Sequence, residues 1–213
     1  GQDWMDGSTG NDLMESTCGD PFLPTRPEIL VVDDIGLEGM TARLLYTIDI
    51  STSTRNPFGG ASVGDVNNDG LLDTILDAEI AALIELNNKV IQDGINAVVG
   101  IVAYESQASQ LDVDPVTAGL QQAVAPDADA DLNGIPDIED ALRSLTAAGQ
   151  TRFEHPLQLA VNFFNSQGTR PGEGTLVFLS DGSPSDPNAY SDEVQSLVST
   201  GVTPRAFGVG TTA

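Results

Sequence analysis

The sequence is poor in cysteine, in basic residues and in long apolar runs. Cys18 is the only cysteine among 213 residues, so no disulfide can form within the chain. No apolar run approaches the length of about 18 residues that a membrane-spanning helix needs, and the polar first ten residues do not resemble a signal peptide. We therefore expect no membrane insertion, and metal ions rather than disulfides are the candidate staples of the fold.

Positive charge is scarce as well. The chain has 8 Lys and Arg against 32 Asp and Glu, which gives a formal net charge of -24. Such a surface repels nucleic acid and anionic membranes, so neither is an expected partner. Divalent cations would relieve the repulsion among so many carboxylates, and calcium is the first candidate. Acidity that serves solubility alone would give the same count, so motifs must decide between the two.

The first fifteen residues carry a repeat of period nine. Gly1, Asp3 and Met5 recur as Gly10, Asp12 and Met14. The stretch at 7–15 resembles the glycine-rich nonapeptide of repeats-in-toxin (RTX) proteins, which implies a remnant of that repeat at 1–17 with Asp3 and Asp12 as candidate calcium ligands. A flexible polar terminus is the plain alternative. Three prolines at 21, 24 and 27 then predict an extended linker over 18–28.

Residues 29–213 alternate between β-rich and helical patterns, which predicts a doubly wound α/β domain with a mostly parallel central sheet flanked by helices. Near-continuous apolar runs favour strands that are buried on both faces. Strands are expected at Ile29–Val32, Leu44–Ile50, Ala97–Tyr104, Thr175–Leu179 and Arg205–Val209, and helices around Leu76–Ile91, Leu157–Phe164 and Val194–Val198. Gly94 is expected to end the first helix.

The strand ending near Ile50 delivers a D-x-S-x-S pattern, Asp49-Ile-Ser51-Thr-Ser53. Alternation along the chain places the carboxylate and the two hydroxyls on one side, at the carboxyl end of a strand where open α/β sheets bind ligands. Oxygen donors of this kind suit Mg²⁺ or Ca²⁺. Taken alone the pattern is weak, because Ser and Thr are ordinary turn residues.

Two later segments strengthen this interpretation. Ala148-Gly-Gln-Thr151 precedes a predicted helix, and Ser180-Asp181-Gly182 ends a predicted strand. In this order the three pieces resemble the metal-ion-dependent adhesion site of the von Willebrand factor type A (vWA) family. The resemblance covers about residues 44–210 and implies that Asp49, Ser51, Ser53, Thr151 and Asp181 hold a divalent ion.

In that family the ion bridges to a carboxylate of a partner, so the resemblance implies a protein or glycan ligand that offers an acidic group. Three departures limit it. Thr52 stands where many members have glycine, a long insertion follows the first loop at 56–72, and the sequence stops at Ala213, before the family's C-terminal helix. Allosteric control through that helix is therefore not expected here.

Two Asp-rich loops match the first nine positions of an EF-hand-type calcium loop, with oxygen side chains at positions 1, 3, 5 and 9 and glycine at 6. The first (loop 1) comprises the candidate ligands Asp65, Asn67, Asp69, Leu71 and Asp73, and the second (loop 2) comprises Asp129, Asp131, Asn133, Ile135, Asp137 and Asp140. Leu71 and Ile135 stand at position 7, where a backbone carbonyl serves. Loop 1 lacks the acidic residue at position 12, where Leu76 stands. Both loops lie near the expected binding edge in sequence and are predicted to stiffen it.

No nucleophile and base can be paired in the sequence. His155 is the only histidine and no G-x-S-x-G is present, so we expect a binding module and not an enzyme. Calcium loops and the RTX resemblance indicate a secreted or cell-surface bacterial adhesin module within a larger multidomain chain. The alternative is a calcium-stiffened spacer that holds a metal ion but recruits no ligand.

Overall fold

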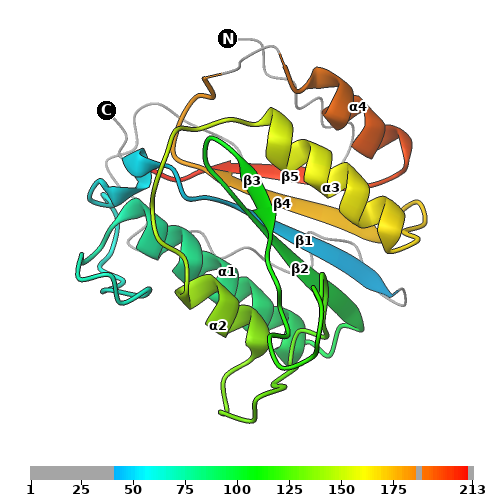
Figure 1. Ribbon diagram of the computed structural model, residues 1–213, viewed down its shortest axis with the longest axis horizontal. Helices are drawn as coiled ribbons and strands as arrows, with labels where there is room; N and C mark the ends of the chain where they lie inside the picture. The colour runs from blue at the N-terminus through cyan, green and yellow to red at the C-terminus, as the bar shows by residue number, and fades with distance from the viewer. Residues whose placement is uncertain (1–40, 186–188, 211–213) are drawn as a thin grey trace.

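A five-stranded sheet with helices on both faces forms the centre of the computed structural model, which describes residues 41–185 and 189–210 (Figure 1). Its strands are β1 (Ala42–Asp49), β2 (Ala97–Tyr104), β3 (Ala108–Gln110), β4 (Gly174–Ser180) and β5 (Thr203–Gly208). Their order across the sheet is β3-β2-β1-β4-β5. Neighbouring strands are parallel except β2 and β3, so the predicted doubly wound, mostly parallel class is confirmed.

Several predictions fall on residues 1–40, outside the described part of the chain. They are the RTX-like repeat with Asp3 and Asp12, the linker at 18–28 and the strand at Ile29–Val32. Each of them stays a prediction from sequence.

Apolar side chains from both faces of the central strands build two cores. On one face, Tyr46 and Ile48 of β1 pack with α1 (Ile75–Gln92) and α2 (Asp137–Arg143). On the other, Leu45 packs with α3 (Glu154–Ser166) and α4 (Ser191–Ser199). Burial of both faces explains the unbroken apolar runs of β1, β2 and β4. For β5 the expectation was wrong, because this edge strand is largely exposed.

Helix α1 begins and ends where its sequence signals place it. The Thr74 side chain accepts a hydrogen bond from the Asp77 backbone, and Asp77 bonds back to the Thr74 backbone, which forms a capping box. At the other end Gly94 follows the last turn with φ 64°, a left-handed conformation that glycine adopts without strain. The strand β3, in contrast, was not expected, because three residues are too few to show a period.

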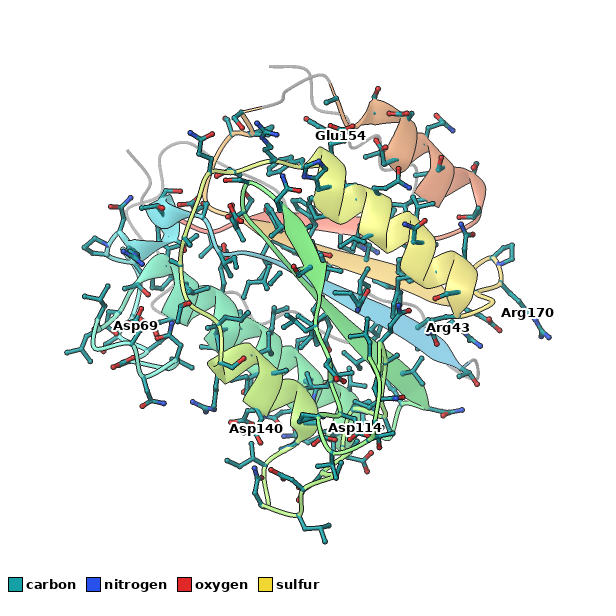
Figure 2. All side chains as sticks on the ribbon, in the orientation of Figure 1. Arg43, Asp69, Asp114, Asp140, Glu154 and Arg170 are labelled. Carbon is teal, nitrogen blue, oxygen red and sulfur yellow. The ribbon has the colours of Figure 1, made fainter. Side chains whose placement is uncertain are left out.

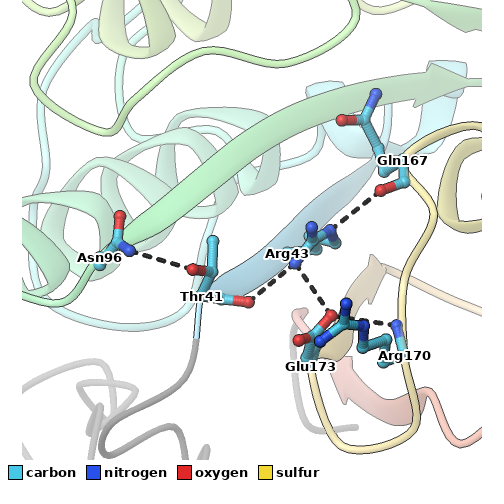
Figure 3. A network of polar contacts seen from close by, with 6 residues as sticks. All are labelled: Thr41, Arg43, Asn96, Gln167, Arg170 and Glu173. Carbon is cyan, nitrogen blue, oxygen red and sulfur yellow. Dashed lines mark hydrogen bonds and ion pairs between the residues drawn. The ribbon is translucent and has the colours of Figure 1, made fainter.

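The end of the sheet where β1 begins is tied by an arginine network (Figure 3). The Arg43 guanidinium donates to the carbonyls of Gln167 (3.1 Å) and Thr41 (3.0 Å) and pairs with the Glu173 carboxylate at 3.0 Å. This contact anchors the turn before β4 beside β1. Within the described residues, no helix combines the length and the apolar content that crossing a bilayer requires.

Candidate metal site

Asp49 lies at the carboxyl end of the central strand β1, and its side chain is fully buried. One carboxylate oxygen accepts a hydrogen bond from the Ser51 backbone at 2.8 Å, and the other accepts one from the Ser180 hydroxyl at 3.0 Å. Ser180 ends β4, so the two neighbouring parallel strands β1 and β4 fix this carboxylate between them. Ser180 was not among the predicted site residues, although it directly precedes Asp181.

Three hydroxyls meet beside Asp49. The Ser51 and Ser53 oxygens are 3.0 Å apart, and the Thr151 hydroxyl donates to the Ser51 oxygen at 3.0 Å. Ser51 and Ser53 flank the start of the short 3₁₀ helix η2 (Thr52–Arg55), while Thr151 precedes α3. Two predicted loops, separated by 100 residues, are thus joined side by side.

Backbone hydrogen bonds hold the second loop against the first. The Ala148 amide donates to the Ile50 carbonyl at 2.6 Å, and the Thr52 amide donates to the Gly149 carbonyl at 3.1 Å. The Arg55 guanidinium adds a bond to the Ala147 carbonyl at 2.6 Å. These bonds hold the backbone that leads to Thr151 against the loop that carries Ser51 and Ser53.

Asp181 completes the set from the third loop. A cavity of about 450 Å³ opens here and is lined by Ser53, Thr151 and Asp181, with Ile75 of α1 at its rim. Ser51 is almost fully buried behind Ser53. All five predicted residues thus belong to one edge of the sheet, and three of them face the cavity.

The electrostatics favour a cation at this edge. Burial, and after it the charge of Asp181, raises the pKa of Asp49, while hydrogen bonds from Ser51 and Ser180 partly offset the rise. The groups with the largest effect on the pKa of Asp49 include no basic side chain. The donors are two carboxylates and three hydroxyls, all oxygen, which is the set that Mg²⁺, Ca²⁺ and Mn²⁺ prefer. The residues therefore fit a hard divalent ion.

No protein-family model and no curated protein matches the sequence. Solved structures do match the fold. A von Willebrand factor type A structure from Catenulispora acidiphila has a TM-score of 0.50 at 20% identity, over 79% of this chain and 33% of that one. The manganese-loaded TRAP protein of Plasmodium vivax has a TM-score of 0.51 at 18% identity, over 80% of this chain and 57% of that one.

A third similar structure is proximal thread matrix protein 1 from the mussel byssus, with a zinc-occupied MIDAS motif. Its TM-score is 0.50 at 18% identity, over 79% of this chain and 35% of that one. The fold is that of a von Willebrand factor type A domain. The chain spans no more than 57% of the length of these three structures, and identities this low concern the vWA fold alone.

The two Asp-rich loops share one backbone conformation over positions 1–7. In each, the amides of positions 5 and 6 donate to the carboxylate of position 1 at 3.0 Å, which is Asp65 in loop 1 and Asp129 in loop 2. Position 4 has φ 57° at Asn68 and 59° at Leu132, and the glycine at position 6 has φ 89° and 87°. At position 7, the amides of Leu71 and Ile135 donate to the side chain of position 5 at 2.9 and 2.7 Å.

Loop 2 gathers its carboxylates. Oxygen atoms of Asp129, Asp131 and Asp137 lie within 4.8 Å of one another, the only such group of acidic, histidine or cysteine side chains in the part of the vWA fold that the structure describes. The Asp140 carboxylate accepts a hydrogen bond from the side-chain amide of Asn133 in the same loop at 2.6 Å. Burial, and then the charges of Asp114, Asp129 and Asp131, raise the pKa of Asp137.

Loop 1 closes differently. The Asp73 carboxylate accepts hydrogen bonds from the amides of Val63 and Gly64, both at 2.7 Å, and from the Ser62 hydroxyl. The position 2 amide, Val66, instead bonds to Asp77 at 2.7 Å. In loop 2 the corresponding amide, Ala130, bonds to Asp137 at 3.1 Å. Asp77 therefore takes in loop 1 the place that Asp137 has in loop 2, which the spacing of the motif did not indicate.

Both loops lie near the binding edge in sequence, but in the structure only loop 1 lies beside that edge. Loop 1 lies between η2 and α1, and the first residue of α1, Ile75, lines the cavity. Loop 2 follows Pro126, whose carbonyl accepts from Asn87 near the far end of α1 at 2.8 Å. In Figure 2, Asp69 of loop 1 lies at the left of the molecule and Asp140 of loop 2 lies in its lower part.

Helix α2 links the two loops. It begins at Asp137 of loop 2, and its last residue, Arg143, donates a hydrogen bond to the Val66 carbonyl of loop 1 at 3.0 Å.

Proposed function

We propose that this chain is a cation-dependent adhesion module. A divalent ion, Mg²⁺ or Ca²⁺, is held by Asp49, Ser51, Ser53, Thr151 and Asp181 and bridges to a carboxylate of a protein or glycan partner. The observation that supports this most directly is the hydroxyl cluster in which Thr151 bonds to Ser51 and Ser51 to Ser53, beside the buried Asp49 carboxylate. Similar structures are manganese-loaded in one case and carry a zinc-occupied MIDAS motif in another.

The site residues have different roles because they are buried to different extents. Asp49 is buried and hydrogen-bonded, so it supplies fixed negative charge at the base of the site. Asp181, Ser53 and Thr151 line the open cavity and define the side from which a partner approaches. A surface of net charge -24 repels an acidic partner unless a cation reverses the local sign. The bound ion supplies that reversal.

The proposal includes calcium at the Asp-rich loops. Loop 2 is the stronger candidate because three carboxylates converge there. Loop 1 is a weaker one, since Asp73 and Asp77 are engaged by backbone amides. Calcium at loop 2 would fix the start of α2, and α2 in turn holds loop 1 beside the site. We further propose a secreted or cell-surface location, a larger parent chain and no catalysis, with His155 of α3 absent from the cavity lining.

Capture from a mixed array of immobilised proteins and acidic glycans tests this function. We expect capture in Mg²⁺ or Ca²⁺, its loss in chelator, and its loss after the array carboxyl groups are methyl-esterified. Asp181→Ala should abolish capture, while Asp192→Ala, which removes an exposed carboxylate of α4, should not. Ion binding without any ion-dependent capture would instead identify a calcium-stiffened spacer.

A further inference from the structure

Glu79 is a buried acid that the five-residue site does not use. It lies in α1 with no exposed surface, and neither carboxylate oxygen has a hydrogen-bond partner among the described residues. Ile75, one turn earlier on the same face of the helix, reaches the rim of the cavity. Glu79 therefore lies within one helical turn of a residue that lines the cavity, on the side of the sheet that α1 covers.

Glu79 lies in a part of α1 that is mostly apolar. Leu76, Ile80 and Leu83 of the same helix belong to the core. Burial, and then the charges of Asp49 and Asp181, raise the pKa of Glu79 well above its usual value. The backbone N–H of Asp49 faces the Glu79 carboxylate and lowers its pKa in part, but its geometry is not that of a hydrogen bond to either oxygen. No basic side chain is among the groups acting on it.

An unpaired carboxylate in a protein interior is costly, and it is retained where a cation or a hydrogen-bond network compensates it. Here the hydrogen bonds are missing, and the nearest charges are the two acids of the site. A divalent ion between Asp49 and Asp181 would supply the missing positive charge. The same ion would be attracted more strongly by three carboxylates than by two.

We propose that Glu79 is a positioning residue for the adhesion-site ion, a third carboxylate behind Asp49 that raises the affinity of the site for divalent cations. This inference rests on the proposed function. It adds a residue from α1 to a site otherwise built from three loops. It also gives the first turns of α1 a role in ion binding that their amphipathic pattern conceals.

The test is calorimetric titration of chelator-stripped protein with Mg²⁺ and with Mn²⁺. Glu79→Gln keeps the shape and removes the charge, and we expect it to weaken binding by roughly 10- to 100-fold, as the loss of groups behind metal ligands does. The melting temperature in chelator should stay equal or rise, because an uncompensated acid has been removed. Unchanged affinity would overturn the proposal, and so would a lower melting temperature in chelator for both Glu79→Gln and Glu79→Met.

Two further variants separate this inference from the function it rests on. Glu85→Gln makes the same charge change at an exposed position of α1 and should bind the ions like wild type. Asp49→Ala should lose the site altogether. If wild type binds and Asp49→Ala does not, equal affinity in Glu79→Gln refutes the role of Glu79 alone. If wild type binds neither ion, the proposed function and this inference fail together.

Discussion

Loop 1 and loop 2 have the same backbone over seven positions and different closures. Both wrap the amides of positions 5 and 6 around the carboxylate of position 1. In loop 2 the helix begins at position 9, so Asp137 turns back over the loop and meets Asp129 and Asp131. In loop 1 position 9 is Asp73 with φ 56°, and α1 begins only at Ile75.

Because α1 begins two positions later in loop 1 than α2 does in loop 2, the acids of loop 1 have different hydrogen-bond partners. Asp73 closes the turn before loop 1, and Asp77 both caps α1 and bonds to the loop. Loop 1 is therefore held by hydrogen bonds within the protein. Loop 2 keeps three carboxylates together with fewer bonds to satisfy them, and their repulsion makes a cation favourable. The same motif is thus closed by hydrogen bonds in loop 1 and suits a metal ion in loop 2.

The largest effect is expected at Asp77. Asp77→Ala removes the capping box and leaves the buried Val66 amide without its acceptor, which should cost about 2–4 kcal/mol. The loss should be equal in chelator and in calcium, because hydrogen bonds hold loop 1. Urea unfolding under both conditions measures it. A loss confined to calcium would show that Asp77 is a metal ligand and would break the contrast between the loops.

The next effect concerns position 1. In calcium at about a hundred times the dissociation constant, a single site adds about 2.7 kcal/mol to the free energy of unfolding. Asp129→Asn should remove the calcium increment attributed to loop 2. Asp65→Asn, the matched change in loop 1, should leave most of the increment in place. Equal losses in the two variants would mean that the loops bind calcium equally well.

Much of the fold and of the site could be predicted from sequence, for physical reasons. Asp49 ends β1, and Ser51 and Ser53 follow it within four residues, so the three had to lie at the same edge of the sheet, although the 3₁₀ helix η2 and not strand alternation sets the positions of the two serines. Strands β1 and β4 are neighbours in a parallel sheet, which brings Asp181 to the same edge. Helical spacing located α1 because its buried face is long. These features depend on local periodicity, which the sequence displays directly.

The features that could not be predicted depend on the backbone conformation of turns and on the path of the chain between elements. A positive φ at Asp73 directs its carboxylate to Val63 and Gly64, and no periodic signal marks such a residue. Loop 2 is near Thr151 in sequence but not in space, because α2 and the residues after it lead the chain from loop 2 to the site. Glu79 was hidden by its position on an apolar helix face.

A smaller effect is expected at Asp114, whose charge acts on Asp137. Its carboxylate bonds to Thr117 on the protein surface, so its influence on a calcium ion is partly screened. Asp114→Asn should weaken calcium binding at loop 2 by about two- to five-fold. Titration with calcium in the Asp65→Asn background isolates that site. A loss of a hundred-fold or more would instead make Asp114 a direct ligand.

The smallest effect is expected in the pH dependence of stability in chelator, which should have opposite signs for the two acids at position 9, Asp73 and Asp137. Hydrogen bonds from Gly64, Ser62 and Val63 lower the pKa of Asp73, so its contribution to stability is present above about pH 4 and is lost as the pH falls through its folded pKa. Burial raises the pKa of Asp137, so stability falls as the pH rises from about 4 through its folded pKa. Carboxyl NMR titration should give midpoints on opposite sides of 4. Midpoints on the same side would remove the contrast.

Calorimetric titration of chelator-stripped protein with Mg²⁺ and then with Ca²⁺, on wild type, Asp49→Ala and Asp129→Ala, tests the central claim most directly. The expected result is one Mg²⁺-competent site that only Asp49→Ala loses and a calcium site that only Asp129→Ala loses. If Mg²⁺ does not bind, or if Asp49→Ala leaves its binding unchanged, the five residues do not form a metal site and the adhesion function is contradicted.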